Sequence, residues 1–146
     1  KESSDDIRAV AVDEGVEDRI LVEASMPFAD LSPYYAALDI GLIMLDDRPN
    51  HRVALPNKLF DYMAFGVPVL APDYPEIRRI VSKHDAGWIL EDWSALRPML
   101  RLLPEASSKL DEKGYNGRKA FLEHYAWEHQ APKFVKVMED LADSAH

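Results

Sequence analysis

The chain of 146 residues contains no cysteine, which excludes a disulfide framework, a thiolate metal site and a thiol nucleophile. Positive charge is also scarce, because 17 lysine and arginine residues stand against 26 aspartate and glutamate residues, for a net charge of −9. Nucleic acids and acidic lipid surfaces both need a cationic face. We therefore expect no nucleic-acid partner, although a local basic patch is compatible with this composition.

Long apolar runs are missing as well. No stretch approaches the ~20 residues that cross a bilayer, and the first ten residues, KESSDDIRAV, lack the apolar centre of a signal peptide. Hydrophobic residues make up 47% of the chain and charged residues 29%, which is typical of one soluble domain with a core. We expect residues 1–146 to form a single cytoplasmic domain without a transmembrane segment, and peripheral membrane association of the full-length protein stays open.

The chain does contain a regular alternation of strand-like and helix-like segments. Its polar start leads into what looks like the latter half of a helix, at residues 7–13, a pattern typical of a cut inside a larger protein. Runs of β-branched and apolar residues predict four strands, at 19–24, 39–45, 67–71 and 88–90. No internal repeat or low-complexity stretch is evident.

Helix signals lie between and after these strands. Three are capping signals, namely Ser32 before Pro33, Asp92, and a capping box formed by Asp73 and Glu76. Another helix begins near Pro56 and ends at Gly66. Residues 105–146 predict two or three helices, broken at Gly114, Gly117 and Pro132 and anchored by Trp127 and Phe134.

This alternation predicts an α/β fold, namely a Rossmann-like open parallel sheet flanked by helices. We expect the sheet to be truncated at its N-terminal side and the C-terminal helices to pack on it. Ligands of such sheets bind at the carboxyl ends of the strands. We therefore expect segments 26–28, 46–57 and 72–76 to meet on one rim.

The helix that begins at Leu55 or Pro56 directs its free N–H groups at that rim, which makes an anion site without a glycine-rich loop. Lys58 lies in the first turn, and Asp61, one turn further on, is placed to accept hydrogen bonds from a diol such as a ribose. Helix geometry alone favours the alternative that Lys58 and Asp61 form a solvated ion pair worth on the order of a few tenths of a kcal/mol.

The sequence of residues 55–81, LPNKLFDYMAFGVPVLAPDYPEIRRIV, followed by AGWIL, resembles the donor-domain signature of the retaining GT-B glycosyltransferases called glycosyl transferases group 1. Two further stretches, DRILVEASMPFADLSPYYAALDIGLIML and YAWEHQAPKFVKVM, are similar to family segments in the same order. The resemblance implies the C-terminal, donor-binding domain of a two-domain hexosyltransferase-type enzyme. It would bind a nucleotide-diphosphate sugar, with no metal or other cofactor, for transfer to an acceptor in polysaccharide or glycoconjugate synthesis.

The resemblance also assigns site residues. Asp61 matches the family's ribose-binding glutamate, and Lys58 lies beside it in the same motif. Leu55, Pro56 and Asn57 match the stretch along the diphosphate and sugar, whereas Met26 and Pro27 match the loop that packs on the base. Val53 replaces a glutamate that contacts the donor sugar in many members, so this contact falls to Asn50, His51 or Arg52, or the loop differs.

No catalytic residue is assigned within the chain. The resemblance places a basic pair for the leaving diphosphate on the first strand-loop unit of the donor domain, upstream of Lys1. It places the acceptor site and a catalytic histidine in an N-terminal domain. Because stabilising the departing phosphate is the main task of such a transfer, we expect the isolated fragment to be inactive and to bind nucleotides weakly at most. Two alternatives stay open, a non-catalytic binding domain of the same fold and another GT-B enzyme such as a nucleotide-sugar epimerase.

Several of these residues also have plain structural interpretations. Met26 and Pro27 can close a strand end, and His51 and Arg52 can be solvated loop residues. Asp73 and Glu76 fit a capping box better than a catalytic pair. We expect the three tryptophans, at positions 88, 93 and 127, to lie in the core or at its edge. The histidines at 84, 124, 129 and 146 show no ligand spacing, so we expect no metal site.

Overall fold

The computed structural model describes residues 4–23, 25 and 27–144. The chain comprises two compact units, residues 1–32 and 33–146. The first contains helix α1 (Ser4–Asp13) and two short 3₁₀ turns, η1 (Glu17–Arg19) and η2 (Phe28–Leu31). In α1, Ala11 is buried and Arg8 donates a hydrogen bond of 2.9 Å to the carbonyl of Val22. The predicted helix at 7–13 is therefore confirmed.

The predicted strand at 19–24 is wrong over its described part, 19–23, where no strand forms. The backbone at Ile20 is extended, with φ −116° and ψ 118°. A strand also needs a neighbour that takes its backbone hydrogen bonds. Within these residues the carbonyl of Val22 is instead satisfied by the side chain of Arg8, so apolar composition alone does not make a strand here.

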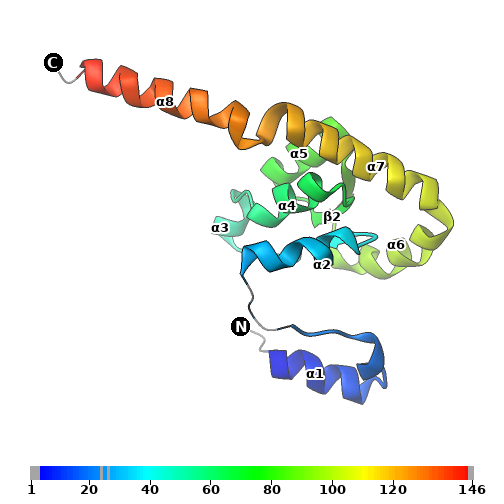
Figure 1. Ribbon diagram of the computed structural model, residues 1–146. Helices are drawn as coiled ribbons and strands as arrows, with labels where there is room; N and C mark the ends of the chain where they lie inside the picture. Colours follow the sequence, from blue (N-terminus) through cyan, green and yellow to red (C-terminus); the bar gives the residue numbers. More distant parts are fainter. Residues whose placement is uncertain (1–3, 24, 26, 145–146) are drawn as a thin grey trace. The chain divides into compact units, whose positions relative to one another are not determined.

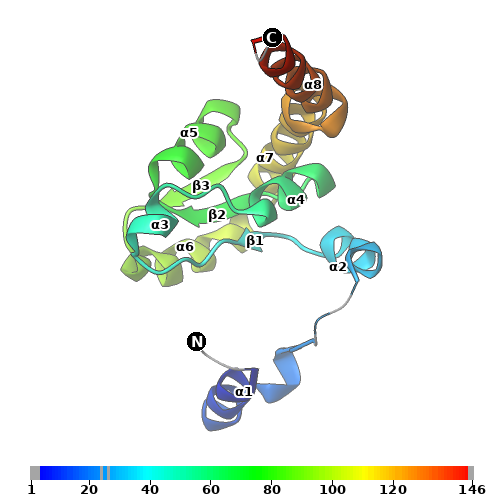
Figure 2. The same ribbon diagram turned by 90° about the vertical axis from the view of Figure 1, so that its left-hand side faces the viewer.

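The second unit is an α/β layer structure around a three-stranded parallel sheet in the order β1-β2-β3. The strands are β1 (Gly41–Leu42), β2 (Val69–Pro72) and β3 (Gly87–Leu90). Gly41 pairs with Val69, which pairs with Gly87 on its other side. The helices before and after β2 are α4 (Asn57–Phe65) and α5 (Pro75–His84), and α6 (Leu96–Leu102) follows β3. Figures 1 and 2 show α5 and α6 on opposite sides of the sheet.

The core of this unit lies between the central strand and its two adjacent helices. Every residue of β2 is buried. The largest fully buried side chains come from the residue after β1 and from β2, α4 and α5: Ile43, Leu59, Met63, Val69, Leu70, Ile77, Ile80 and Val81. The predicted Rossmann-like open parallel sheet is confirmed. Gly66 ends α4 as expected, in the left-handed conformation at φ 71°.

Two predicted helix starts are wrong. Ser32 has helical backbone angles, because η2 already turns helically before α2 (Ser32–Ala36), so Ser32 does not cap it. At α5, Pro75 occupies the first turn and moves the cap to Tyr74, which makes no side-chain cap bond. Asp73 pairs with Arg78 instead of capping. The cap of Asp92 is confirmed, since its carboxylate accepts a 2.7 Å hydrogen bond from the backbone N–H of Ser94, at the start of η3 (Trp93–Ala95).

The C-terminal part forms η4 (Leu103–Ala106), α7 (Ser107–Ala120), a π-helical turn η5 (Phe121–Tyr125) and α8 (Trp127–Ser144). The predicted breaks at Gly114 and Gly117 are wrong, because both lie inside α7. A Cβ atom on Gly114 would lie 2.1 Å from the carbonyl oxygen of Gly66. Glycine there permits close packing of α7 on the end of α4 rather than a turn.

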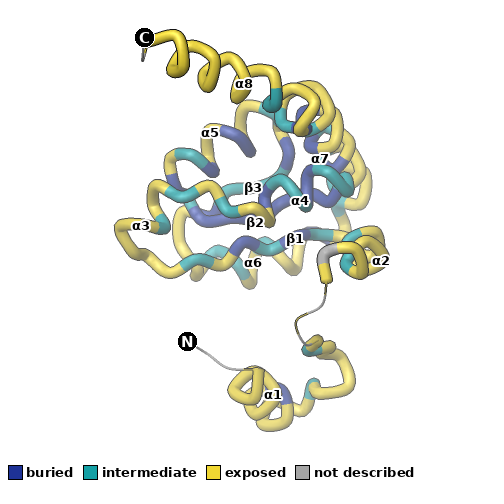
Figure 3. The backbone as a smooth tube through the Cα atoms, turned by 60° about the vertical axis from the view of Figure 1, so that its left-hand side comes forward, coloured by how far each residue is buried: buried dark blue, intermediate teal, exposed yellow. Residues whose placement is uncertain are grey.

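Helix α8 also differs from expectation. Pro132 lies inside the helix without ending it. Trp127 and Phe134 are 68% and 59% exposed, so neither anchors the C-terminal helices on the sheet, and no described residue of α8 is buried. Figure 3 shows α8 as an almost entirely exposed tube. In the C-terminal part, α7 packs against α4, α5 and β3, and the π-helical turn η5 packs against α4.

Candidate functional site

The segments that follow β1 and β2 meet at the carboxyl edge of the sheet. The hydroxyl of Tyr74 donates a hydrogen bond of 3.2 Å to the carbonyl of Leu45, which joins the two strand ends. A cleft of about 370 Å³ opens beside this contact, and we call it the rim cleft. Its lining is Asp47, Arg52, Pro72, Asp73, Tyr74, Leu90, Glu91, Asp92 and Trp93. Parts of 46–57 and 72–76 therefore lie together on one rim.

The rim cleft carries mostly negative charge, since four of its lining residues are carboxylates and one is an arginine. The guanidinium of Arg52 bonds both carboxylate oxygens of Asp47, at 2.5 and 2.6 Å, and holds the pKa of Asp47 below its usual value. Arg78 lowers the pKa of Asp73 in the same way. A diphosphate entering this cleft would meet like charges, so its electrostatics disfavour a phosphate here.

The loop before α4 contains a short helix that the sequence did not predict, α3 (Pro49–Arg52). The Nδ1 atom of His51 lies 3.0 Å from the carbonyl oxygen of Asp46. Val53, at the end of α3, is 74% exposed. The residues that follow β1 thus form a compact helical turn whose polar side chains bond mainly to one another.

Helix α4 begins with an uncapped first turn. Pro56 is the cap residue with extended backbone, at φ −72° and ψ 139°, and makes no side-chain cap bond. The first turn contains no acidic residue, and both Asn57 and Lys58 are exposed. Backbone N–H groups at an uncapped helix start attract an anion, and the helix dipole adds to this.

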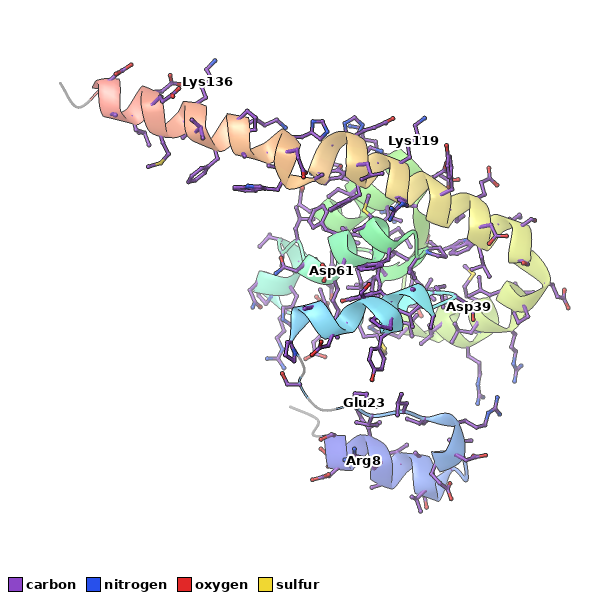
Figure 4. All side chains as sticks on the ribbon, viewed as in Figure 1. Arg8, Glu23, Asp39, Asp61, Lys119 and Lys136 are labelled. Carbon is purple, nitrogen blue, oxygen red and sulfur yellow. The ribbon has the colours of Figure 1, made fainter. Side chains whose placement is uncertain are left out.

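Asp61 lies one turn further along α4, where α4 passes α2, and is labelled in Figure 4. It is half-buried, and its carboxylate accepts a hydrogen bond of 3.3 Å from the hydroxyl of Tyr35. Among the described residues, no ion pair joins Lys58 to Asp61, so the structure does not show the solvated pair that helix geometry favoured. Sequence reasoning missed this partner of Asp61, because Tyr35 is 26 residues away.

The ring of Tyr35 is held on two sides. It stacks on Phe65 with centroids 5.0 Å apart and meets Tyr62 edge-on at 5.7 Å. Burial, with the negative charge of Asp61 next in importance, raises the pKa of Tyr35 to about 12. Tyr35 therefore stays protonated at neutral pH and is a hydrogen-bond donor to the carboxylate.

The two other assigned site residues lie outside this unit. Met26 falls outside the described residues. Pro27 is the cap of η2, with φ −57° and ψ 145°, in the unit of residues 1–32. Whether these two residues meet a base bound beside Asp61 stays a prediction.

The tryptophans and histidines are also placed by the fold. Trp88 is half-buried, with the Nζ atom of Lys113 5.1 Å from its ring centroid, while Trp93 lines the rim cleft. His84 and His124, distant in sequence, approach with ring centroids 5.4 Å apart. Within the part of the chain that the structure describes, no group of three or more metal-ligating side chains is gathered.

Comparison with known proteins decides the family. The profile described as Glycosyl transferases group 1 matches residues 1–103, well over half of the chain. The chain belongs to the group 1 glycosyl transferases. A search of curated proteins gave no match.

A solved structure supports the fold of this group 1 chain. Sucrose-phosphate synthase from Thermosynechococcus elongatus superposes with a TM-score of 0.80 at 20% sequence identity. The match covers 94% of this chain and 34% of that chain, so the group 1 chain spans about a third of the length of its structural relative. The similarity shows a shared fold. No described helix of the group 1 chain is long and apolar enough to cross a membrane.

Proposed function

We propose that this group 1 glycosyl transferase chain binds a nucleotide-diphosphate sugar, and that the protein containing it transfers the hexosyl group to an acceptor in polysaccharide or glycoconjugate synthesis. The observation that carries the proposal is the position of Asp61 behind the uncapped start of α4. An anion site and a diol site then lie on one helix.

The spacing supports this pairing. Asn57 and Asp61 are four residues apart, which corresponds to a rise of about 6 Å along a helix. A ribose that bonds Asp61 through its hydroxyls would thus hold its 5′-diphosphate near the N–H groups of the first turn. Lys58, exposed in that turn, would add a positive charge beside the phosphates.

Each residue then has a distinct role. Asp61 accepts hydrogen bonds from the ribose diol, while Tyr35 fixes the carboxylate and acts as a positioning residue. Leu55, Pro56 and Asn57 lie along the diphosphate and sugar. Met26 and Pro27 would pack on the base. The contact to the donor sugar that a glutamate makes in many family members is not supplied by Val53, whose apolar side chain is exposed.

Binding of UDP and GDP, followed by amide NMR shifts of residues 1–146, tests the proposal. We expect weak binding, with shifts centred on residues 55–61. Asp61→Asn should weaken nucleotide binding about tenfold, because one charge-assisted hydrogen bond is lost. Asp111→Asn, a change of an exposed aspartate on α7, is the matched control. Shifts elsewhere, or equal losses in both variants, would contradict the site.

A non-catalytic binding domain of the same fold is the second candidate, favoured by the exposed Val53 and by the occupied carboxylate of Asp61. The two functions differ in the full-length protein. Transfer of a hexose from a nucleotide sugar by that protein, with a lower rate in Asp61→Asn at limiting donor, supports the enzyme. Nucleotide binding without any transfer or donor hydrolysis supports the binding domain.

A further inference from the structure

A second cleft, of about 550 Å³, lies between α4, α5, η5 and the first turns of α8, all within the unit of residues 33–146. We call it the basic cleft. Four of its lining residues carry or can gain positive charge, namely Arg79, Lys83, His124 and Lys133. None of the described residues that line it is a carboxylate. In a chain of net charge −9 this is a marked separation of charge.

The arginine and the two lysines come from two elements that the fold brings together. Arg79 and Lys83 lie four residues apart on α5, and therefore on one face of that helix, while Lys133 comes from α8. Among the described residues, neither lysine forms an ion pair. Arg79 bonds Glu76, but through Nε and Nη2 to a single carboxylate oxygen, and this exposed pair is weak and leaves other N–H groups for a ligand.

Next to the cations the cleft has an apolar wall. Leu55, Phe60, Ile80 and Tyr125 line it, and the rings of Phe60 and Tyr125 pack with centroids 5.2 Å apart. The neighbouring His84 responds to this positive charge. Its pKa is lowered first by burial and then by the charges of Lys83, His124 and Arg79. A concave site with convergent charges and an apolar wall is typical of small-molecule pockets, which measure about 300–1,000 Å³.

We infer that the basic cleft binds a small phosphomonoester, with the phosphate between Arg79, Lys83 and Lys133 and the organic group on Phe60 and Leu55. A phosphate dianion gains more from three cations than a carboxylate does, because the attraction grows with the charge of the ligand. The site goes beyond the proposed donor function. It shares Leu55 with the stretch assigned to the donor diphosphate, but Asp61 and the exposed Lys58 do not line this cleft.

Phenyl phosphate is the test ligand, measured by calorimetry with residues 1–146. We expect it to bind more tightly than inorganic phosphate, because only the ester covers the apolar wall. The double variant Lys83→Gln, Lys133→Gln should weaken binding by about a hundredfold, roughly tenfold for each charge-assisted hydrogen bond. Both lysines are exposed, so folding of the double variant is expected to persist.

The matched control is Lys109→Gln, Lys136→Gln, which removes the same charge at positions that do not line the cleft; Figure 4 labels Lys136 on α8. A change of less than threefold in the affinity of this control for phenyl phosphate supports the inference. Equal loss in both double variants would show only long-range charge attraction and would overturn it, as would equal affinity for phenyl phosphate and inorganic phosphate. Loss of phenyl phosphate binding in Asp61→Asn would place the phosphate at the donor site instead. If only UDP and GDP fail to bind, the donor proposal fails and the inference about the basic cleft is unaffected.

Discussion

The hydroxyl of Tyr35 lies 3.3 Å from a carboxylate oxygen of Asp61 and joins α2 to α4. The bond does two things for the candidate donor site. It fixes the direction of the carboxylate, and it occupies one of its oxygens while the other stays available to a ligand. A preorganised carboxylate loses less conformational freedom when a diol binds.

Removing this hydroxyl should cost stability without disturbing the packing. Tyr35→Phe keeps the ring on Phe65 and deletes one hydrogen bond, so the free energy of unfolding in urea should fall by about 1 kcal/mol. Tyr34→Phe, at an exposed neighbouring position, should change it by less than about 0.5 kcal/mol. An equal effect of the two substitutions would contradict the bond.

The raised pKa of Tyr35 predicts instability at high pH. The group titrates at 10.0 when unfolded and at about 12 in the folded chain. Between these values the folded state holds more protons than the unfolded state, so stability falls as the pH rises through this window. We expect the Tm to drop between pH 9 and pH 11, and the drop to be smaller in Tyr35→Phe. The remaining decline comes from Tyr62, Tyr74 and Tyr125, whose pKa values are also raised.

His84 predicts the opposite dependence near neutral pH. Its pKa is lowered from 6.5, mainly by burial, and its Nε2 atom lies 3.0 Å from the hydroxyl of Tyr125. As the pH falls below 6.5, the unfolded chain takes up the proton first, so stability decreases until the folded histidine also titrates. The Tm should therefore fall between pH 7.5 and pH 5.5. His84→Gln should flatten this slope, whereas His129→Gln on the exposed α8 should leave it unchanged.

The close approach of α7 to Gly66 predicts an unusual response to alanine. Alanine in a helix is favoured over glycine by about 1 kcal/mol, yet Gly114→Ala would bring its Cβ against a backbone oxygen at 2.1 Å. We expect a net loss of about 1–3 kcal/mol in chemical denaturation, because backbone cannot move aside as a side chain does. At Gly117 the nearest atom is the Cβ of Ala86 at 3.3 Å, so Gly117→Ala should stay within about 1 kcal/mol of the parent.

The exposed side chains of α8 predict that substitutions on this helix change stability little. Trp127→Ala and Phe134→Ala remove large apolar groups that are mostly in solvent, so the free energy of unfolding should change by less than about 0.5 kcal/mol. Leu59→Ala, at a fully buried position of α4, should cost about 2–5 kcal/mol. A large loss for Trp127→Ala would show that α8 packs more tightly than its exposure indicates.

Much of the fold could be predicted because its signals are local. The apolar runs at 67–71 and 88–90 overlap β2 and β3, and Pro56 with Gly66 marks both ends of α4. The parallel order follows from the alternation itself. Asp61 and the helix start of the candidate site came from the same local patterns and from the family resemblance.

What the sequence could not predict depends on contacts between distant residues. Gly114 suggests a helix break until Gly66 is known to lie against it. The apolar residues Trp127 and Phe134 suggest anchors, but burial depends on what another element presents to them. The capping signal of Ser32 before Pro33 predicts a helix over Tyr35 but gives no indication that its hydroxyl reaches Asp61.

The docking of α7 also sets where the chain can be cut. Gly114 and Gly117 lie against Gly66, Met63 and Ala86, and Ala120 at the end of α7 is buried. A truncation before Ser107 would therefore expose one side of the α4 and α5 layer to solvent. Among the described residues 127–144, a truncation after Ala126 removes no buried residue. The minimal folding unit of residues 33–146 therefore ends near Ala126, and a shortened protein of that length should keep its sheet while losing the lysine that α8 contributes to the basic cleft.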